Sequence, residues 1–321
     1  MMNAVNEHIE RGVKAHLAGN LLKAESAYKD ALSLDGGNAT AHNNIGFIYG
    51  QQQRWNQALK HLKIALEIRP DMAMARTNLG QVLMNMGNAE ESLRQLEKAV
   101  ELDPRNIQGW DNLARVRLHT GNFQGAEYAW MRAVEMAPED PRLLTRLGTA
   151  VAAQRRLKEA VRIFERAIEK EPVNTDAWAQ LGVTHFLRED FGSAQDALKN
   201  ALRIDPKDCT ALRHLGLIHL ARGKKDDAID AFQRVVELAP EDKGTRLDLA
   251  VTLLSAHRGL ESLAHLDDLA EVENNNDRVM FYRGLALRQL GKIQEGNEQL
   301  TQVTELNGEY ANRAREILTT S

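Results

Sequence analysis

The chain has 321 residues, of which 43% are hydrophobic and 27% are charged, and these values are typical of a folded soluble protein. Its formal net charge of −4 argues against a nucleic-acid-binding protein, which needs a basic domain or stripe. No run of about 18 apolar residues occurs, so we expect no membrane span. Cys209 is the only cysteine, which excludes an internal disulfide and a cysteine-rich structural zinc site.

The first residues of the chain are polar. Glu7, Glu10 and Arg11 lie where a signal peptide would need an apolar stretch. We therefore expect a cytoplasmic protein, with export by a route that leaves no N-terminal mark as the alternative.

Small residues return every 34 positions along the whole chain. The first series is glycine in seven places and alanine in two: Gly12, Gly46, Gly80, Ala114, Gly148, Gly182, Gly216, Ala250 and Gly284. A second small residue follows 12 positions after each of these, and proline follows after 24 positions in repeats two to seven. An unbroken period of this length indicates a solenoid in which each unit stacks on its neighbours.

Each repeat contains two apolar stretches with three- and four-residue spacing, which predict two amphipathic helices, here called helix A and helix B. Positions within a repeat run from 1 to 34, with the first small residue at position 8. Position 15 lies between the two helices, where glycine suits a left-handed helix end, and it is glycine in five repeats: Gly19, Gly87, Gly121, Gly223 and Gly291. Proline at position 32 ends helix B.

Small residues at positions 8, 20 and 27, a large residue at 24 and proline at 32 resemble the tetratricopeptide repeat, as in WDNLARVRLHTGNFQGAEYAWMRAVEMAP from Trp110 to Pro138. The resemblance covers nine repeats and implies an all-α, right-handed superhelical solenoid. The repeats are 5–38, 39–72, 73–106, 107–140, 141–174, 175–208, 209–242, 243–276 and 277–308. We interpret the aromatic residues at positions 4 and 24, including Trp110 and Trp178, as core packing.

Two features mark the C-terminal part. Apolar residues at helical spacing predict a single capping helix over residues 309–321. Repeat eight is the poorest match, since Ala250 replaces glycine and its exit, residues 273–277, is polar and rich in turn formers. It predicts a hinge or a change of superhelical pitch near residues 270–280, and a degenerate repeat that stacks normally is the alternative.

The resemblance implies that helix A lines a concave groove with positions 2, 5, 6, 9, 12 and 13. Position 6 is asparagine in three consecutive repeats, Asn44, Asn78 and Asn112. A carboxamide has both a donor and an acceptor, so such a ladder would hold the backbone of an extended peptide. It is similar to the asparagine ladder in the superhelical tetratricopeptide domain of peptide O-linked GlcNAc transferases, although no glycosyltransferase domain follows here. Asparagines that bond to a neighbouring helix or to water are the alternative.

Four arginines lie on the same stripe: Arg115, Arg142, Arg146 and Arg213. If they converge, they favour an acidic segment or a C-terminal carboxylate by bidentate pairing. The alternative is a solvated face whose charges pair among themselves.

The C-terminal half of the stripe is apolar at Val183, Phe186, Leu217, Leu220, Val251, Leu254, Phe281 and Leu285. If several of these are exposed together, they form an interface for an amphipathic partner helix or for a second copy of the chain. Burial between neighbouring A helices is the alternative.

The sequence holds no phosphate-binding glycine loop and no HExxH, GxSxG or CxxC motif. We therefore expect no catalysis, no cofactor and no metal, and a scaffold or adaptor that binds a peptide or unstructured segment of a partner protein. One alternative is a structural scaffold that forms homo-oligomers through its apolar C-terminal repeats. Another is an accessory subunit of an enzyme or of a secretion machine.

Overall fold

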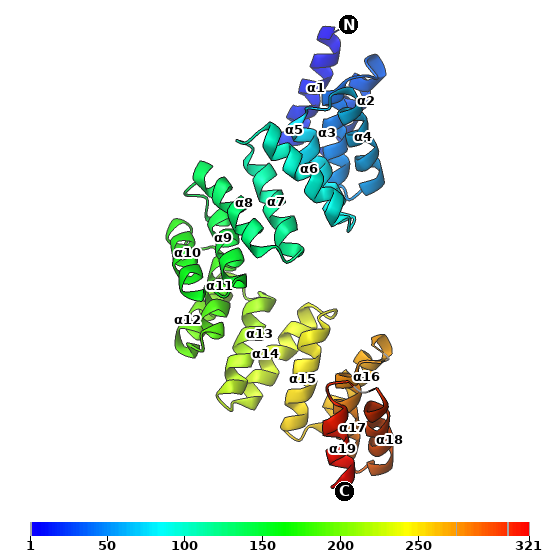
Figure 1. Ribbon diagram of the computed structural model, residues 1–321, viewed down its shortest axis with the longest axis vertical. Helices are drawn as coiled ribbons and strands as arrows, with labels where there is room; N and C mark the ends of the chain where they lie inside the picture. The colour runs from blue at the N-terminus through cyan, green and yellow to red at the C-terminus, as the bar shows by residue number, and fades with distance from the viewer. Residues whose placement is uncertain (1, 274, 307, 321) are drawn as a thin grey trace. The chain divides into compact units, whose positions relative to one another are not determined.

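A computed structural model describes residues 2–273, 275–306 and 308–320. Within these ranges the secondary structure consists of helices α1 to α19, with no strand (Figure 1). The helices belong to two compact units, Met1–Lys170 and Glu171–Ser321. The all-α solenoid expected from the sequence is confirmed.

The N-terminal unit stacks five helix pairs. Helices A carry odd numbers and helices B carry even numbers: α1 (Met2–Leu17), α2 (Leu21–Leu34), α3 (Ala39–Gln51), α4 (Trp55–Ile68), α5 (Ala73–Asn85), α6 (Ala89–Leu102), α7 (Ile107–His119), α8 (Phe123–Met136), α9 (Pro141–Ala153) and α10 (Leu157–Lys170). Each helix A packs on its own helix B, and α2, α4, α6 and α8 each pack on the next helix A. Successive A helices also touch, since α3 contacts α5 and α5 contacts α7.

The C-terminal unit repeats this arrangement. Its helices are α11 (Thr175–Leu187), α12 (Phe191–Ile204), α13 (Cys209–Ala221), α14 (Lys225–Leu238), α15 (Lys243–Ser255), α16 (Gly259–Val272), α17 (Asp277–Gln289), α18 (Ile293–Glu305) and α19 (Ala311–Thr319). The short helix α19 packs on α18, and Ala314 lies in one buried cluster with Leu300 and Val303. Around the expected hinge, Leu269 of α16 and Val279 of α17 share a buried cluster, while Asn274 lies outside the described residues.

The last residue of a repeat caps the next helix A. Position 34 is asparagine or aspartate in seven of the first eight repeats, at Asn38, Asn106, Asp140, Asn174, Asp208, Asp242 and Asn276. Each of these side chains accepts a hydrogen bond from the first turn of the helix that follows; Asn38 Oδ1, for example, accepts from the Ala41 amide at 3.0 Å. Such a cap contributes about 1 kcal/mol.

The small residue at position 8 lets helices A and B approach closely. A Cβ atom built on Gly148 would lie 2.6 Å from Cε1 of Phe164, the large residue at position 24 of the same repeat. Where serine replaces alanine at position 20, its hydroxyl donates to the facing backbone, as Ser92 Oγ does to Gly80 O at 2.6 Å. The 34-residue pattern therefore follows from the crossing of two helices.

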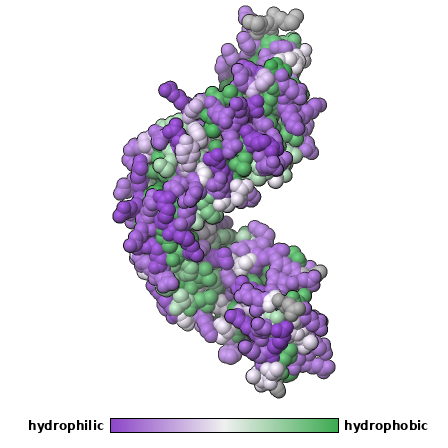
Figure 2. Space-filling model, in the orientation of Figure 1, coloured by the Kyte–Doolittle hydropathy of each residue, from purple (hydrophilic) through white to green (hydrophobic). Residues whose placement is uncertain are grey.

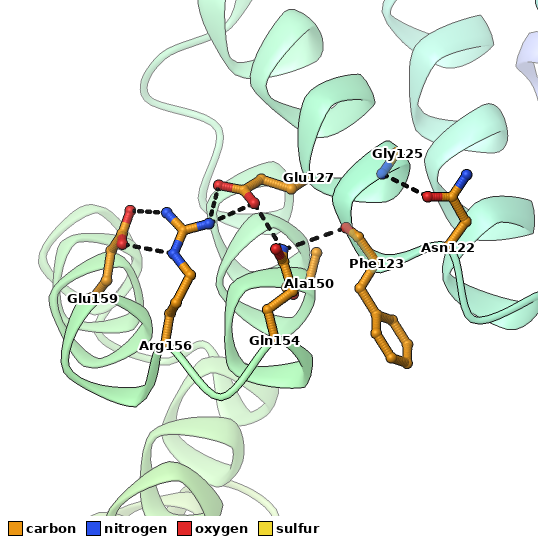
Figure 3. A network of polar contacts seen from close by, with 8 residues as sticks. All are labelled: Asn122, Phe123, Gly125, Glu127, Ala150, Gln154, Arg156 and Glu159. Atoms are coloured by element: carbon orange, nitrogen blue, oxygen red, sulfur yellow. Dashed lines mark hydrogen bonds and ion pairs between the residues drawn. The ribbon is translucent and has the colours of Figure 1, made fainter.

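Carboxylate–arginine contacts join some neighbouring repeats. Glu127 of α8 accepts from Arg156 Nη1 at 2.8 and 2.6 Å and from Gln154 Nε2 at 2.7 Å, while Arg156 also pairs with Glu159 (Figure 3). Glu127 is at position 21 and Arg156 is at position 16 of the next repeat. Glu25 and Arg54 occupy the same two positions at the first junction and pair at 2.8 Å.

Hydrophilic side chains cover most of the molecular face in Figure 2, and apolar residues show between them. In the part of the chain that the structure describes, no helix is both long enough and apolar enough to cross a membrane.

Candidate partner-binding surface

The three asparagines at position 6 have different surroundings. Asn44 is half-buried, whereas Asn78 and Asn112 are only 4% and 5% exposed. Asn78 Nδ2 of α5 donates to Asn43 Oδ1 of α3 at 2.9 Å, and Asn43 Nδ2 donates to Asn44 Oδ1 at 3.1 Å. Asn44 and Asn78 therefore belong to a chain of carboxamides that links two A helices.

Two buried polar atoms in this row have no hydrogen-bond partner among the described residues: the acceptor Asn78 Oδ1 and the donor Asn112 Nδ2. The residue placed to pair with Asn112 is Thr77, but its hydroxyl donates to Ala73 O at 3.1 Å and accepts from Asn106 Nδ2 at 3.2 Å. Buried polar groups are nearly always paired, and leaving one unpaired costs about 1–3 kcal/mol. Both atoms are buried in this conformation, so another group would reach them only after the carboxamides rotate.

Asn44 and Asn78 border a hollow of about 200 Å³, here called the anchor hollow. Its lining contains no Asp, Glu, Lys or Arg and consists of Val13, His16, Tyr28, Asn43, Asn44, Phe47, Met74, Asn78 and Gln108. Val13 is 39% exposed and Met74 is 48% exposed, so apolar surface lies open beside the carboxamides.

Three of the four candidate arginines are in ion pairs within the chain. Arg142 pairs with its helix cap Asp140 at 3.0 Å, and these bonds lower the pKa of the Asp140 carboxyl despite its partial burial. Arg146 pairs with Asp111. Arg142 and Arg146 thus make the contacts expected if the charges on this face pair among themselves.

The remaining two arginines differ from each other. Arg213 lies in the C-terminal unit and pairs with Asp248 at 3.0 Å. Arg115 of α7 is exposed and has neither an ion pair nor a hydrogen bond among the described residues. It shares with Arg146 a second hollow of about 370 Å³, here called the arginine hollow, which Met84, Arg115, Leu118, His119, Trp130, Arg146 and Thr149 line. Arg142 is not part of this lining.

Sequence reasoning missed one rule of this surface. At three junctions the side chains at position 6 and at position 5 of the preceding repeat, 35 residues earlier, are bonded to each other. The pairs are Asn43–Asn78, Asp111–Arg146 and Arg213–Asp248. Complementary residues at this separation are the signal that would have found it.

The apolar stripe of the C-terminal unit is partly exposed. Phe281 is buried, since it is 5% exposed and packs on Leu300, Val303 and Tyr310. The other seven side chains are half-buried: Val183, Phe186, Leu217, Leu220, Val251, Leu254 and Leu285.

A third hollow, of about 650 Å³, lies between α4, α5 and α6, where Leu59 and Asn88 replace the glutamate and arginine of other junctions. Its floor includes Leu79 and Leu83, and both basic and acidic side chains surround it. The mixed charges give it no single electrostatic preference.

Reactive side chains are sparse in the described part of the chain. No group of three or more His, Cys, Asp or Glu residues there could hold a metal ion. Cys209, the first residue of α13, is half-buried, and burial together with Asp208 raises the pKa of its thiol. A raised pKa keeps the thiol protonated and therefore weakly nucleophilic.

Three family models match the chain. Residues 102–208 match the cytochrome c-type biogenesis protein H TPR domain, and residues 37–104 and 188–243 match two tetratricopeptide repeat models. All three describe repeats, and none describes a catalytic family. No curated protein matches the chain.

Solved structures show the same architecture. The crystal structure of YrrB, described as a TPR protein with an unusual peptide-binding site, is 25% identical over 59% of this chain and 97% of its own, with a TM-score of 0.51. A tetratricopeptide repeat protein from Parabacteroides merdae is 18% identical over 78% of this chain and 99% of its own, with a TM-score of 0.62. A chain of the APC/C hetero-tetramer Cut9-Hcn1 is 17% identical over 83% of this chain and 52% of its own, with a TM-score of 0.64. With the 34-residue pattern and the stacked helix pairs, these matches show that the chain is a tetratricopeptide repeat protein.

Proposed function

We propose that this protein is a non-catalytic scaffold or adaptor whose A helices in the N-terminal unit bind an extended segment of a partner protein. Tetratricopeptide repeat domains are in general protein–protein interaction scaffolds. The observation that carries the proposal is the pair of unpartnered buried atoms, Asn78 Oδ1 and Asn112 Nδ2, in adjacent repeats.

Each polar residue has a distinct part in this proposal. After rotation of their buried carboxamides, Asn78 accepts a hydrogen bond from a backbone N–H of the partner and Asn112 donates one to a backbone C=O. Asn44 holds the carboxamide chain in place. Arg115 attracts an acidic residue, because its guanidinium has no ion pair among the described residues. The preference for an acidic residue would be strengthened by the other three arginines, Arg142, Arg146 and Arg213, only if they shared or exchanged their present carboxylate partners.

The test is affinity capture from native lysate with the wild-type protein beside the Asn78→Ala/Asn112→Ala variant, followed by affinity measurement on the captured partner's segment. Each neutral hydrogen bond contributes about 0.5–1.5 kcal/mol, so the loss of both is expected to weaken binding roughly tenfold. Asn56→Ala is the matched control, because Asn56 is exposed on helix α4. Equal affinity of the wild-type and double-variant proteins would exclude this mechanism.

A second candidate function is self-association through the apolar stripe of the C-terminal unit, which seven half-buried side chains favour. Light scattering that gives a monomer mass at every concentration would exclude it. If Leu217→Asp abolishes a concentration-dependent dimer, self-association becomes the better proposal. A cytoplasmic location and an accessory role beside an enzyme or a secretion machine stay predictions, and cell fractionation checks the first.

A further inference from the structure

We infer that the bound segment carries two marks, a large apolar side chain for the anchor hollow and an acidic residue for the arginine hollow, about five to nine residues apart. The inference rests on the proposed function and specifies which sequences the surface selects.

The two hollows occupy equivalent places in different repeats. Position 24 supplies the floor of each, as Tyr28 in the anchor hollow and as Trp130 in the arginine hollow. Positions 9, 12 and 6 supply the walls of both. Position 9 makes the difference, since it is Val13 and Phe47 in one hollow and Arg115 and Thr149 in the other. The same cavity therefore recurs with opposite chemical preference.

The anchor hollow suits one large apolar side chain. Val13, Phe47 and Met74 surround it, and the ring of His16 meets Phe47 edge-on with centroids 5.3 Å apart. Methionine adapts to differently shaped partners because its side chain is unbranched and flexible. No charged aspartate, glutamate, lysine or arginine lines this hollow, so nothing there compensates a charged guest.

The arginine hollow has an uncompensated positive charge. Asp111 is already engaged, since it accepts from Arg146 and from Trp130 Nε1, the latter at 2.8 Å. Within the described residues Arg115 has no carboxylate partner, and no aspartate or glutamate lines the hollow. A guanidinium beside apolar walls favours a carboxylate guest through paired N–H donors.

The spacing follows from the stacking of the A helices. Neighbouring packed helices lie about 8–10 Å apart, and the hollows are two to three helix steps apart, which gives roughly 16–30 Å. An extended chain advances about 3.3 Å per residue, so about five to nine residues span this distance. The unpartnered atoms lie between the two marks: Asn78 borders the anchor hollow, and Asn112 precedes Arg115 by one turn of α7.

The probe is a random peptide library displayed on phage, selected against the full-length wild-type protein, Arg115→Glu, and the control Arg162→Glu, which changes an exposed arginine of α10. Wild type and control are expected to enrich peptides that pair a large apolar residue with Asp or Glu at the stated spacing. Arg115→Glu is expected to enrich Lys or Arg at the acidic position instead. Measured by fluorescence anisotropy, the Arg115→Glu substitution should weaken the binding of peptides selected on the wild-type protein at least tenfold.

The outcomes separate the inference from the proposed function. Peptides that bind and depend on Asn78 and Asn112, but lack the paired marks or ignore Arg115→Glu, overturn the inference and leave the proposed function standing. No enrichment by the wild-type protein, or peptides that bind the asparagine variant equally well, overturn both. A Met74→Glu variant that still selects the apolar residue overturns the anchor half.

Discussion

The indole Nε1 of Trp110 donates a hydrogen bond to the carbonyl oxygen of Pro104 at 2.9 Å, across the turn from α6 to α7. The same contact from position 4 to the position-32 carbonyl of the preceding repeat recurs with different donors, in His42–Gly36, Arg76–Pro70, Trp178–Pro172 and Arg246–Pro240. Position 4 therefore ties each of these A helices to the preceding repeat. The interpretation of Trp110 and Trp178 as core packing left this polar contact out.

Trp110→Phe is expected to lower the free energy of unfolding, because phenylalanine keeps an aromatic ring but cannot donate to Pro104 O. The lost hydrogen bond and the reduced packing together should cost about 1–2 kcal/mol. Urea unfolding of the full chain, followed by circular dichroism, measures the effect. Trp55→Phe is the control, since the Trp55 indole makes no hydrogen bond among the described residues. An equal loss of stability in both variants would contradict the role of the Trp110 hydrogen bond.

The sequence predicted the helix pairs well because their cause is periodic. Close crossing of helices A and B requires small residues, and the consequence is visible at Gly148 against Phe164. The left-handed turn at position 15 could be predicted from the sequence only in some of the repeats. Its backbone is left-handed at five glycines and also at Gln53, Arg155, Glu189 and His257, and a side chain at those four positions hides the conformation.

The candidate site was harder to predict, because position 6 both faces the groove and contacts the preceding A helix. Asn78 and Arg146 look alike as groove residues in the sequence, yet the first leaves one atom unpaired and the second is engaged with Asp111. Whether a side chain at position 6 is fully paired depends on the residue 35 positions earlier. A reading of one repeat at a time therefore finds the surface but not its free groups.

Glu189→Gly is expected to stabilise the protein, because Glu189 adopts φ 61°, where a side chain is disfavoured. The relief of strain exceeds the entropic cost of glycine, and a gain of about 0.5–1 kcal/mol is expected. Gly121→Ala, at φ 78°, should destabilise by a similar or larger amount. Gly192→Ala is the control at a position with space for a Cβ atom, and thermal unfolding compares the three. A destabilised Glu189→Gly variant would show that its side-chain contacts matter more than its backbone.

Glu127→Ala is expected to destabilise the junction between the α7–α8 and α9–α10 pairs by about 1–3 kcal/mol, since it removes hydrogen bonds to a charged and mostly buried group. Burial alone would raise the pKa of Glu127, but the bonds from Arg156 and Gln154 outweigh it and lower the pKa below its usual value. This stabilisation is therefore present above pH 4.5 and is lost as the pH falls further. Glu159→Ala, which removes the exposed partner of Arg156, should cost less than about 1 kcal/mol. Equal costs in urea unfolding at pH 7 would contradict the asymmetry.

The His42–His61 pair is expected to make stability sensitive to mild acid. The two Nδ1 atoms lie 2.9 Å apart, and burial, with the charges of His42, Lys60 and Lys29, lowers the pKa of His61 to about 4. The unfolded chain takes up a proton near pH 6.5 while the folded chain does not, so stability falls as the pH drops from 6.5 towards 4. NMR titration of the His61 ring should give the low pKa directly. In melting curves, His61→Gln should lose less stability than the wild type between pH 7 and 5, whereas parallel losses would mean that His61 protonates freely in the folded state.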